Sequence, residues 1–256
     1  MSAPAAKGNV PIMTVLSQYQ RPATLHDALE LLSRDGSMVL AGGTGVNAGQ
    51  RPTAAMLVDL QALGLDVVHV ADDGVLVVGA TARLGDLATT AAAPLWLRDL
   101  ARKELPSALR TLATVGGTVV AGGWESALVA GLLACDAVVT MVGREGTTQL
   151  GLAALLADLD LIAGCIITAV RLDTTGSASV HTTARTIADR PIVACIARHT
   201  ATGVRVAMSG VAATPVVVDD VEQLAPPGDF RGSAGYRLHL ARVLCTRALI
   251  ELGADS

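Results

Sequence analysis

The chain has 256 residues, of which 51% are hydrophobic and only 16% charged, and its net charge is −4 at pH 7. This composition excludes a disordered chain. It also argues against a nucleic-acid-binding protein, because no basic excess is available to neutralise phosphates. Only 2% of the residues are aromatic, so alanine, valine and leucine must build the core.

Residues 1–10 are small and polar, and we expect them to form a disordered tail. They lack the basic-then-apolar order of a signal peptide, and no later stretch of about 18 residues is continuously apolar. We therefore expect a cytoplasmic protein with no membrane span. The four cysteines are widely spaced and the five histidines are scattered, so the sequence predicts reduced thiols and no metal site.

The N-terminal part predicts a small unit of strands and one helix. Residues 22–33 carry leucine and alanine at helical spacing, and Thr24 is the expected N-cap. Short buried strands are expected at 37–41 and at 55–60.

The middle of the chain predicts a hairpin, several helices and two further strands. An Asp-Gly pair between two valine-rich runs predicts the hairpin, because this dipeptide favours tight turns between antiparallel strands. The hairpin strands are expected at 67–70 and 75–79, helices at 84–90, 95–105 and 128–135, and the further strands at 138–142 and 166–172.

The last third of the chain begins after a polar stretch. Residues 173–183 are rich in Thr, Ser and Gly and are the candidate linker, which places a boundary near Gly176. Beyond it, an Arg-Pro pair near a first turn predicts a helix at 190–197. The remaining expected elements are strands at 204–208 and 216–218 and a long helix at 233–252.

Two glycine-rich segments are the strongest candidates for binding chemistry. Residues 39–45 (VLAGGTG) and 113–118 (ATVGGT) both combine a glycine pair with threonines, and we expect buried strands beside both. Without Cβ atoms, the amides of such loops can point at phosphate oxygens, and Thr44 can add a hydroxyl donor. One such loop is more often a plain turn, but with two of them a diphosphate held from two sides is as good an interpretation as two plain turns.

The order and spacing of several motifs resemble one known family. These motifs are residues 41–44 (AGGT), 77–80 (VVGA) with 84–87 (LGDL), and 109–117 (LRTLATVGG). Together they resemble the FAD-binding (medium) subunit of the molybdenum hydroxylases, the group of xanthine dehydrogenase and carbon monoxide dehydrogenase. The resemblance extends from about residue 15 to residue 252 and so covers nearly the whole chain.

The resemblance implies an α+β fold in two parts. A FAD-binding (PCMH-type) α/β domain is expected at 11–175, made of subdomains at about 11–64 and 65–175 that hold FAD between them. A C-terminal α+β domain with a small antiparallel sheet and helices is expected at 176–256.

The resemblance also implies a role and partners. The protein would pass electrons from a separate [2Fe–2S] small subunit to an external acceptor, while a molybdopterin-binding large subunit performs the hydroxylation. We assign no catalytic residue, and we expect neither a nucleic-acid nor a membrane partner. A homodimer is left open.

FAD is the implied cofactor, and the two glycine loops are implied to cradle its diphosphate and to approach its ring. The implied cofactor-binding residues are Leu40, Ala41, Gly42, Gly43, Thr44, Gly45, Val46, Ala113, Thr114, Gly116, Gly117, Thr118, Trp124, Ala127 and Ile166.

Several positions on the ligand side depart from the family pattern. Thr118 and Thr111 stand where the family has Asn, Ala127 where it has an Asp, Trp124 in place of a proline, and Gly45 where Asp is frequent. These losses leave a second hypothesis open, in which a divergent member with a degenerate flavin site binds another small molecule or catalyses a non-redox reaction. In that case, Trp124 and Ala127 should lie where the flavin ring would sit.

Overall fold

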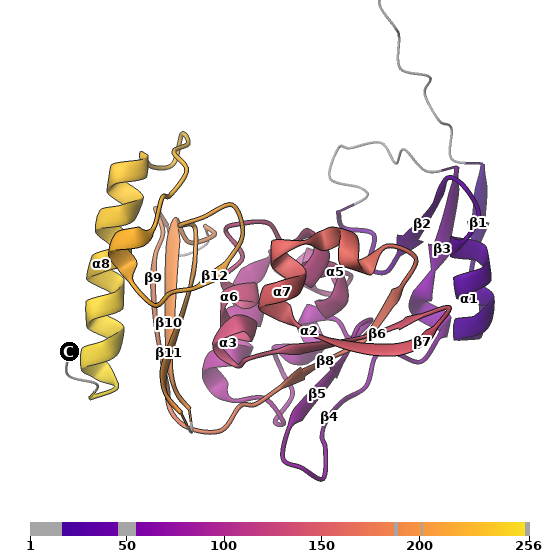
Figure 1. Ribbon diagram of the computed structural model, residues 1–256, viewed down its shortest axis with the longest axis horizontal. Helices are drawn as coiled ribbons and strands as arrows, with labels where there is room; N and C mark the ends of the chain where they lie inside the picture. The colour runs from indigo at the N-terminus through magenta and orange to yellow at the C-terminus, as the bar shows by residue number, and fades with distance from the viewer. Residues whose placement is uncertain (1–16, 46–54, 187–188, 201, 254–256) are drawn as a thin grey trace, which may run out of the picture.

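The computed structural model describes residues 17–45, 55–186, 189–200 and 202–253. Helices and strands are mixed along this part of the chain and form three sheets, which confirms the expected α+β class (Figure 1). The tail expected at 1–10 and the candidate residue Val46 lie outside the described residues. None of the described helices is both long and apolar enough to cross a membrane.

The N-terminal unit is a three-stranded parallel sheet with one helix. Its strands lie in the order β1 (Gln18–Gln20), β3 (Met56–Asp59) and β2 (Ser37–Leu40), and α1 (Leu25–Leu32) packs against them. Thr24 caps α1 as expected, because its side-chain oxygen accepts a hydrogen bond from Asp27 N at 3.1 Å. The expected elements of this unit are therefore present.

The middle of the chain forms a five-stranded antiparallel sheet with short helices. Its strand order is β4 (Val68–Val70), β5 (Leu76–Gly79), β8 (Ile166–Leu172), β6 (Val138–Gly143) and β7 (Gly146–Gly151). The helices are α2 (Leu84–Leu87), α3 (Leu95–Glu104), α4 (Ser107–Arg110), α5 (Val115–Ala121), α6 (Ala127–Ala134) and α7 (Leu152–Ala157). Single 3-10 turns lie at Leu60–Ala62, Leu159–Ile162 and Val221–Gln223.

The strand β7 is not among the elements expected from the sequence. This strand is an edge strand with mostly exposed residues, and its sequence GTTQLG lacks the apolar alternation that marks a half-buried strand. The hairpin expected between the two valine-rich runs, in contrast, is present as β4 and β5.

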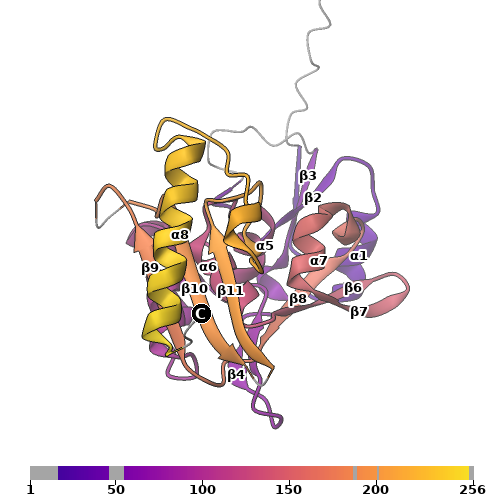
Figure 2. The same ribbon diagram turned by 60° about the vertical axis from the view of Figure 1, so that its left-hand side comes forward.

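The C-terminal unit is a four-stranded antiparallel sheet between two helices. Its strand order is β12 (Val216–Val217), β11 (Gly203–Ser209), β10 (Val193–Thr200) and β9 (Ala178–Thr183). The long helix α8 (Ala234–Glu251) covers one face of this sheet, and α6 packs against the other (Figures 1 and 2).

Two expectations in this region are wrong. The helix expected at 190–197 is instead the strand β10, whose first six residues are all buried. Because α8 and α6 cover both faces of the sheet, β10 carries a continuous apolar run, which periodicity cannot distinguish from a buried helix. The candidate linker at 173–183 contains the edge strand β9, whose Thr and Ser residues suit an extended conformation at a sheet edge.

Candidate functional site

A cavity of about 740 Å³ lies between the N-terminal unit and the five-stranded sheet. This volume is within the range of about 300–1,000 Å³ that is typical of small-molecule and cofactor sites. Both glycine loops line it, as predicted. The predicted site residues among those that line it are Ala41, Gly42, Gly43, Thr44, Gly45, Thr114, Gly116, Gly117, Thr118 and Ile166.

The first glycine loop follows β2 and lies against the chain that leads into the second loop. A Cβ atom on Gly42 would lie 2.0 Å from the backbone oxygen of Leu112, so only glycine allows the two segments to approach this closely. Gly43 has a φ of +69°, a left-handed conformation that also favours glycine. The amides of residues 42–45 donate no hydrogen bond to any other described residue, and they are called the free amides in this sense.

The second glycine segment is the start of a helix and not a loop beside a strand. Thr114 is the N-cap of α5, and its Oγ1 accepts a hydrogen bond from Gly117 N at 3.1 Å. The amides of Val115 and Gly116 donate to the carbonyls of Ala82 and Ala80, each at 2.9 Å. Both glycine segments were expected to offer amides to a phosphate, but the amides of this one are already bonded within the protein.

Close packing explains the first glycine of this second pair. A Cβ atom on Gly116 would lie 2.9 Å from the carbonyl oxygen of Ala80, in the backbone just after β5. The hydroxyl of Thr118 donates to Thr114 O at 2.9 Å, which fixes that side chain within the helix. Thr114 Oγ1 acts as an acceptor toward Gly117, so its own hydrogen is available to a ligand. This side of the cavity therefore offers a surface of small residues and one hydroxyl donor.

The cavity walls combine these polar groups with apolar side chains. Leu105, Leu109, Ile162 and Ile167 line the same space. Free amides in the first loop and the Thr114 hydroxyl suit an anionic diphosphate, and the apolar side chains suit a flat aromatic ring. The residues present therefore fit FAD.

Four of the predicted residues do not line the cavity. Leu40 lies in β2, and Ala113 is buried below the second glycine segment. Ala127 is the first residue of α6 and is buried in the main core. The ring of Trp124 packs under the guanidinium of Arg237, with its centroid 4.5 Å from Cζ. Trp124 and Ala127 thus belong to packing contacts outside the cavity.

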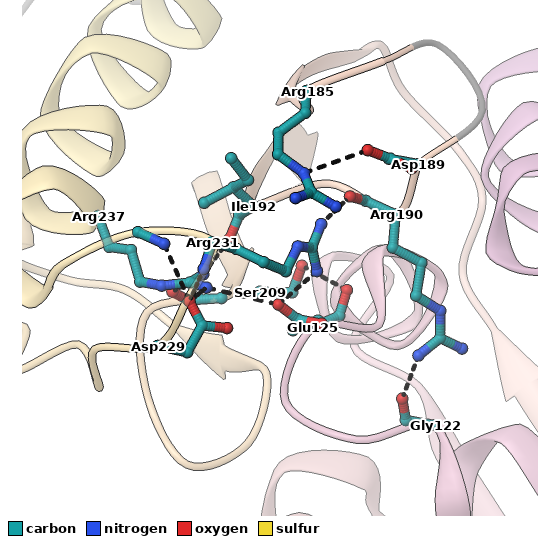
Figure 3. Close-up of polar contacts among 12 residues, drawn as sticks. Gly122, Glu125, Arg185, Asp189, Arg190, Ile192, Ser209, Asp229, Arg231 and Arg237 are labelled. Atoms are coloured by element: carbon teal, nitrogen blue, oxygen red, sulfur yellow. Dashed lines mark hydrogen bonds and ion pairs between the residues drawn. The ribbon is translucent and has the colours of Figure 1, made fainter.

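The residue after Trp124, Glu125, contacts the C-terminal unit through buried ion pairs. Glu125 Oε1 accepts a hydrogen bond from Arg231 Nη1 at 2.6 Å and lies 3.5 Å from Arg237 Nη2 (Figure 3). Arg237 is fully buried, and its Nη2 also donates to Asp229 Oδ1 at 2.7 Å. The departures from the family pattern at Trp124 and Ala127 therefore flank a specific ionic contact between the units.

Sequence reasoning missed the one charged side chain among the described residues that line the cavity, which is Arg190. Its guanidinium pairs with Glu104 at the end of α3, Nη2 to Oε1 at 3.0 Å. Burial raises the pKa of Glu104 above its ordinary value, while the charge of Arg190 and the Leu128 amide lower it. Arg190 and Glu104 lie 86 residues apart in the sequence, so no local sequence pattern predicts this ion pair.

Comparisons with known proteins show the family of the chain. Residues 14–174 match the family described as "FAD binding domain in molybdopterin dehydrogenase", and they make up more than half of the chain. The chain is also 29% identical over 248 residues to the uncharacterized protein YgfM of Escherichia coli K12, over 90% of this chain and 94% of that one.

Solved structures share the fold over almost the full length. A chain of quinoline 2-oxidoreductase from Pseudomonas putida 86 matches with a TM-score of 0.82 at 20% identity, covering 99% of both chains. A chain of carbon monoxide dehydrogenase from Oligotropha carboxidovorans matches with a TM-score of 0.81 at 22% identity, covering 94% of this chain and 98% of that one. The chain therefore belongs to the family of the FAD-binding domain in molybdopterin dehydrogenase, whose cofactor is FAD.

Proposed function

We propose that this protein is the FAD-binding electron-transfer subunit of a molybdopterin-dependent hydroxylase or dehydrogenase. It would take electrons from a [2Fe–2S] partner subunit and pass them to an external acceptor, while a molybdopterin-binding partner oxidises the substrate. The observation that carries the proposal is the meeting of both glycine segments at one cavity, with the free amides of residues 42–45 on one side. Bound FAD supplies the ability to accept and release electrons.

The protein's own residues would bind and shield the cofactor. The free amides of the first loop and the Thr114 hydroxyl would hold the diphosphate, because hydrogen bonds to a charged group are among the stronger ones in proteins. Leu105, Leu109 and Ile162 would exclude water from the ring. Ile166 and Ile167 at the start of β8 would form the neighbouring wall.

The alternative of a degenerate flavin site depended on Trp124 and Ala127 facing the ring. Neither residue lines the cavity, so that observation does not favour the alternative. Titration of the cofactor-free protein with FAD separates the two functions. A dissociation constant at or below about 1 µM, roughly −8 kcal/mol, is expected for the electron-transfer subunit. Binding weaker than about 100 µM would contradict the proposal.

Electron transfer needs a separate test. We expect the chain, tagged and isolated from its native cells under mild conditions, to bring with it molybdenum and iron that metal analysis detects. The same chain produced alone should carry FAD but neither metal. A native preparation that contains FAD and neither metal would contradict the partners proposed here and leave FAD binding intact.

The first glycine loop gives a direct prediction. Gly43→Val is expected to weaken FAD binding by roughly 10- to 100-fold, because a branched side chain disturbs the left-handed backbone and the free amides beside it. Loss of one hydrogen bond to a charged group costs about 1.5–3 kcal/mol. Fluorescence titration with FAD measures the change.

Gly74→Val is the matched control for this variant. Gly74 also has a positive φ, +80°, but it lies in the turn between β4 and β5 and does not line the cavity. This control variant should bind FAD as the wild type does. Equal flavin affinity in the wild type and Gly43→Val would remove the first loop from the binding site.

A further inference from the structure

The first glycine loop runs alongside α5 from the start of the helix to its end. A Cβ atom on Gly42 would lie 3.0 Å from Cα of Ala113, which directly precedes the N-cap of α5. A Cβ atom on Gly45 would lie 3.8 Å from Cβ of Ala121, the last residue of the same helix. A diphosphate held by the free amides of residues 42–45 would therefore lie next to α5, with the Gly45 amide at the C-terminal end of the helix.

Arg190 reaches the cavity at this same end of α5. Its Nη1 donates to the backbone oxygen of Gly122, the C-cap residue that follows Ala121, at 3.3 Å (Figure 3). Ala121, Gly122 and Arg190 all line the cavity, and so does Gly45. Two consecutive residues of the chain thus connect the guanidinium with the Gly45 end of the first loop.

Glu104 fixes the position of this guanidinium. Its backbone oxygen accepts a hydrogen bond from Arg190 Nε at 3.1 Å, and its Oε1 accepts one from Nη2 at 3.0 Å. The Glu104 side chain is only 2% exposed, and its Oε2 accepts a hydrogen bond from Leu128 N at 3.1 Å, so the carboxylate is itself held in place. The position of Arg190 is therefore set without a ligand.

The guanidinium keeps hydrogen-bond donors for a ligand. It has five N–H groups, and three of them are used by Glu104 and Gly122. One N–H on each terminal nitrogen makes no hydrogen bond to another described residue, and 35% of the side chain is exposed. Arg190 is also the one charged side chain among the described residues that line the cavity. A planar cation with two outer N–H groups suits the oxygens of a phosphate.

We propose that Arg190 binds the diphosphate of FAD together with the first glycine loop. The inference rests on the proposed function and adds one binding residue to it. Arg190 lies between β9 and β10, outside the residues 14–174 that match the family. The N-terminal unit would thus supply neutral amides to the diphosphate, and the C-terminal unit would supply the positive charge.

Removing the charge should weaken FAD binding in a way that depends on salt. We expect Arg190→Gln to lower FAD affinity at least about tenfold at low salt, because charge-assisted hydrogen bonds to phosphate are lost. The Debye length falls from about 10 Å at 0.1 M salt to about 3 Å at 1 M. The ratio of wild-type to variant affinity should therefore shrink as sodium chloride is added. Fluorescence titration of the cofactor-free full chain with FAD, at low and at high salt, measures both effects.

Arg205→Gln is the matched control. Arg205 Nε donates to the backbone oxygen of Leu133 at 3.0 Å, and its Nη2 lies 2.8 Å from Asp136 Oδ1, so its contacts resemble those of Arg190. Its side chain is 29% exposed, but it does not line the cavity. This variant also loses one positive charge and should bind FAD as the wild type does. Arg190→Lys keeps the charge and should keep the salt dependence of the wild type.

A second background covers the case in which Arg190→Gln does not fold. That variant leaves the buried carboxylate of Glu104 without its cation. Glu104→Gln removes this carboxylate and keeps an oxygen for the Leu128 amide. The double variant Arg190→Gln with Glu104→Gln, compared with Glu104→Gln alone, should show the same salt-dependent loss of FAD affinity.

The outcomes separate this inference from the proposed function. A salt-dependent loss in Arg190→Gln that is absent from Arg205→Gln and Arg190→Lys supports the inference. Wild-type affinity in Arg190→Gln overturns it, and so does a loss that is equal at all salt concentrations or is matched by Arg190→Lys. An equal loss at all salt concentrations would mean that Arg190 contacts an uncharged part of the cofactor or acts on the fold alone. In each of these cases, tight FAD binding by the wild type leaves the proposed function intact, whereas a wild type that binds no FAD overturns both.

Discussion

Replacing Gly42 with alanine is expected to weaken FAD binding by at least 100-fold and to destabilise the protein. The added Cβ would lie 2.0 Å from the oxygen and 2.8 Å from the carbon of the Leu112 carbonyl, and 3.0 Å from Ala113 Cα. These are backbone atoms, which cannot rotate away as a side chain would. The two glycine segments must then move apart, and the amides of the first lose their position relative to Thr114. Overpacking of this kind costs about 1–3 kcal/mol and occasionally more.

Gly45→Ala is the matched control in the same loop. Its Cβ would lie 3.8 Å from the Cβ of Ala121, an ordinary van der Waals contact. We expect the stability of this variant to stay within about 0.5 kcal/mol of the wild type, as for an unconstrained substitution. Urea unfolding of the cofactor-free proteins and FAD titration measure the two effects. Wild-type stability and FAD affinity in Gly42→Ala would show that the loops do not need this close approach.

The second large effect is expected at the ionic contact between the units. Glu125→Ala should destabilise the protein by about 3–5 kcal/mol, because it leaves buried arginines without their carboxylate. The side chain of Arg237 is 0% exposed and that of Arg231 8% exposed, so water cannot replace Glu125. Asp229 still contacts Arg237, but no other carboxylate pairs with Arg231 among the described residues. The free energy of unfolding in urea measures the loss.

An exposed pair provides the comparison. Glu222 and Arg242 also form an ion pair, but their side chains are 58% and 47% exposed. Glu222→Ala should therefore cost only about 0–1 kcal/mol. Similar decreases in the free energy of unfolding in Glu125→Ala and Glu222→Ala would mean that burial does not strengthen the Glu125 contact. A further variant, Glu125→Gln, keeps one oxygen for Arg231 and should fall between the wild type and Glu125→Ala.

Local patterns predicted those parts of the fold that depend on neighbouring residues. The Thr24 cap, the Asp-Gly hairpin and the long C-terminal helix follow from short-range preferences, and all three are present. The sequence does not predict the strand β10, because helices cover both faces of its sheet. Its residues are therefore apolar on both sides and lack the alternation of apolar and polar residues that identifies a strand. Its neighbour β9 was read as a linker because edge strands tolerate polar residues.

The site was predictable where glycine marks it and not where distant residues meet. Gly42 and Gly116 are needed because each lies against another stretch of backbone. The glycine-rich pattern indicates such a close approach but does not identify the backbone segment that is approached. The pattern did not show that the amides of the second segment are used by Ala80 and Ala82. Arg190 enters the cavity only through tertiary contacts, which are invisible in one sequence.

The helix α6 has a consequence for how the protein can be divided. All eight of its residues are buried, and it packs against α3 on one side and against β10 and β11 on the other. The main core also includes Ala194, Ile196 and Ala207 from the C-terminal sheet. The segment that matches the family, residues 14–174, therefore shares its main hydrophobic core with the C-terminal sheet. Truncating the chain after residue 174 would expose the side of α6 that packs against β10 and β11. The exposed apolar surface would favour aggregation.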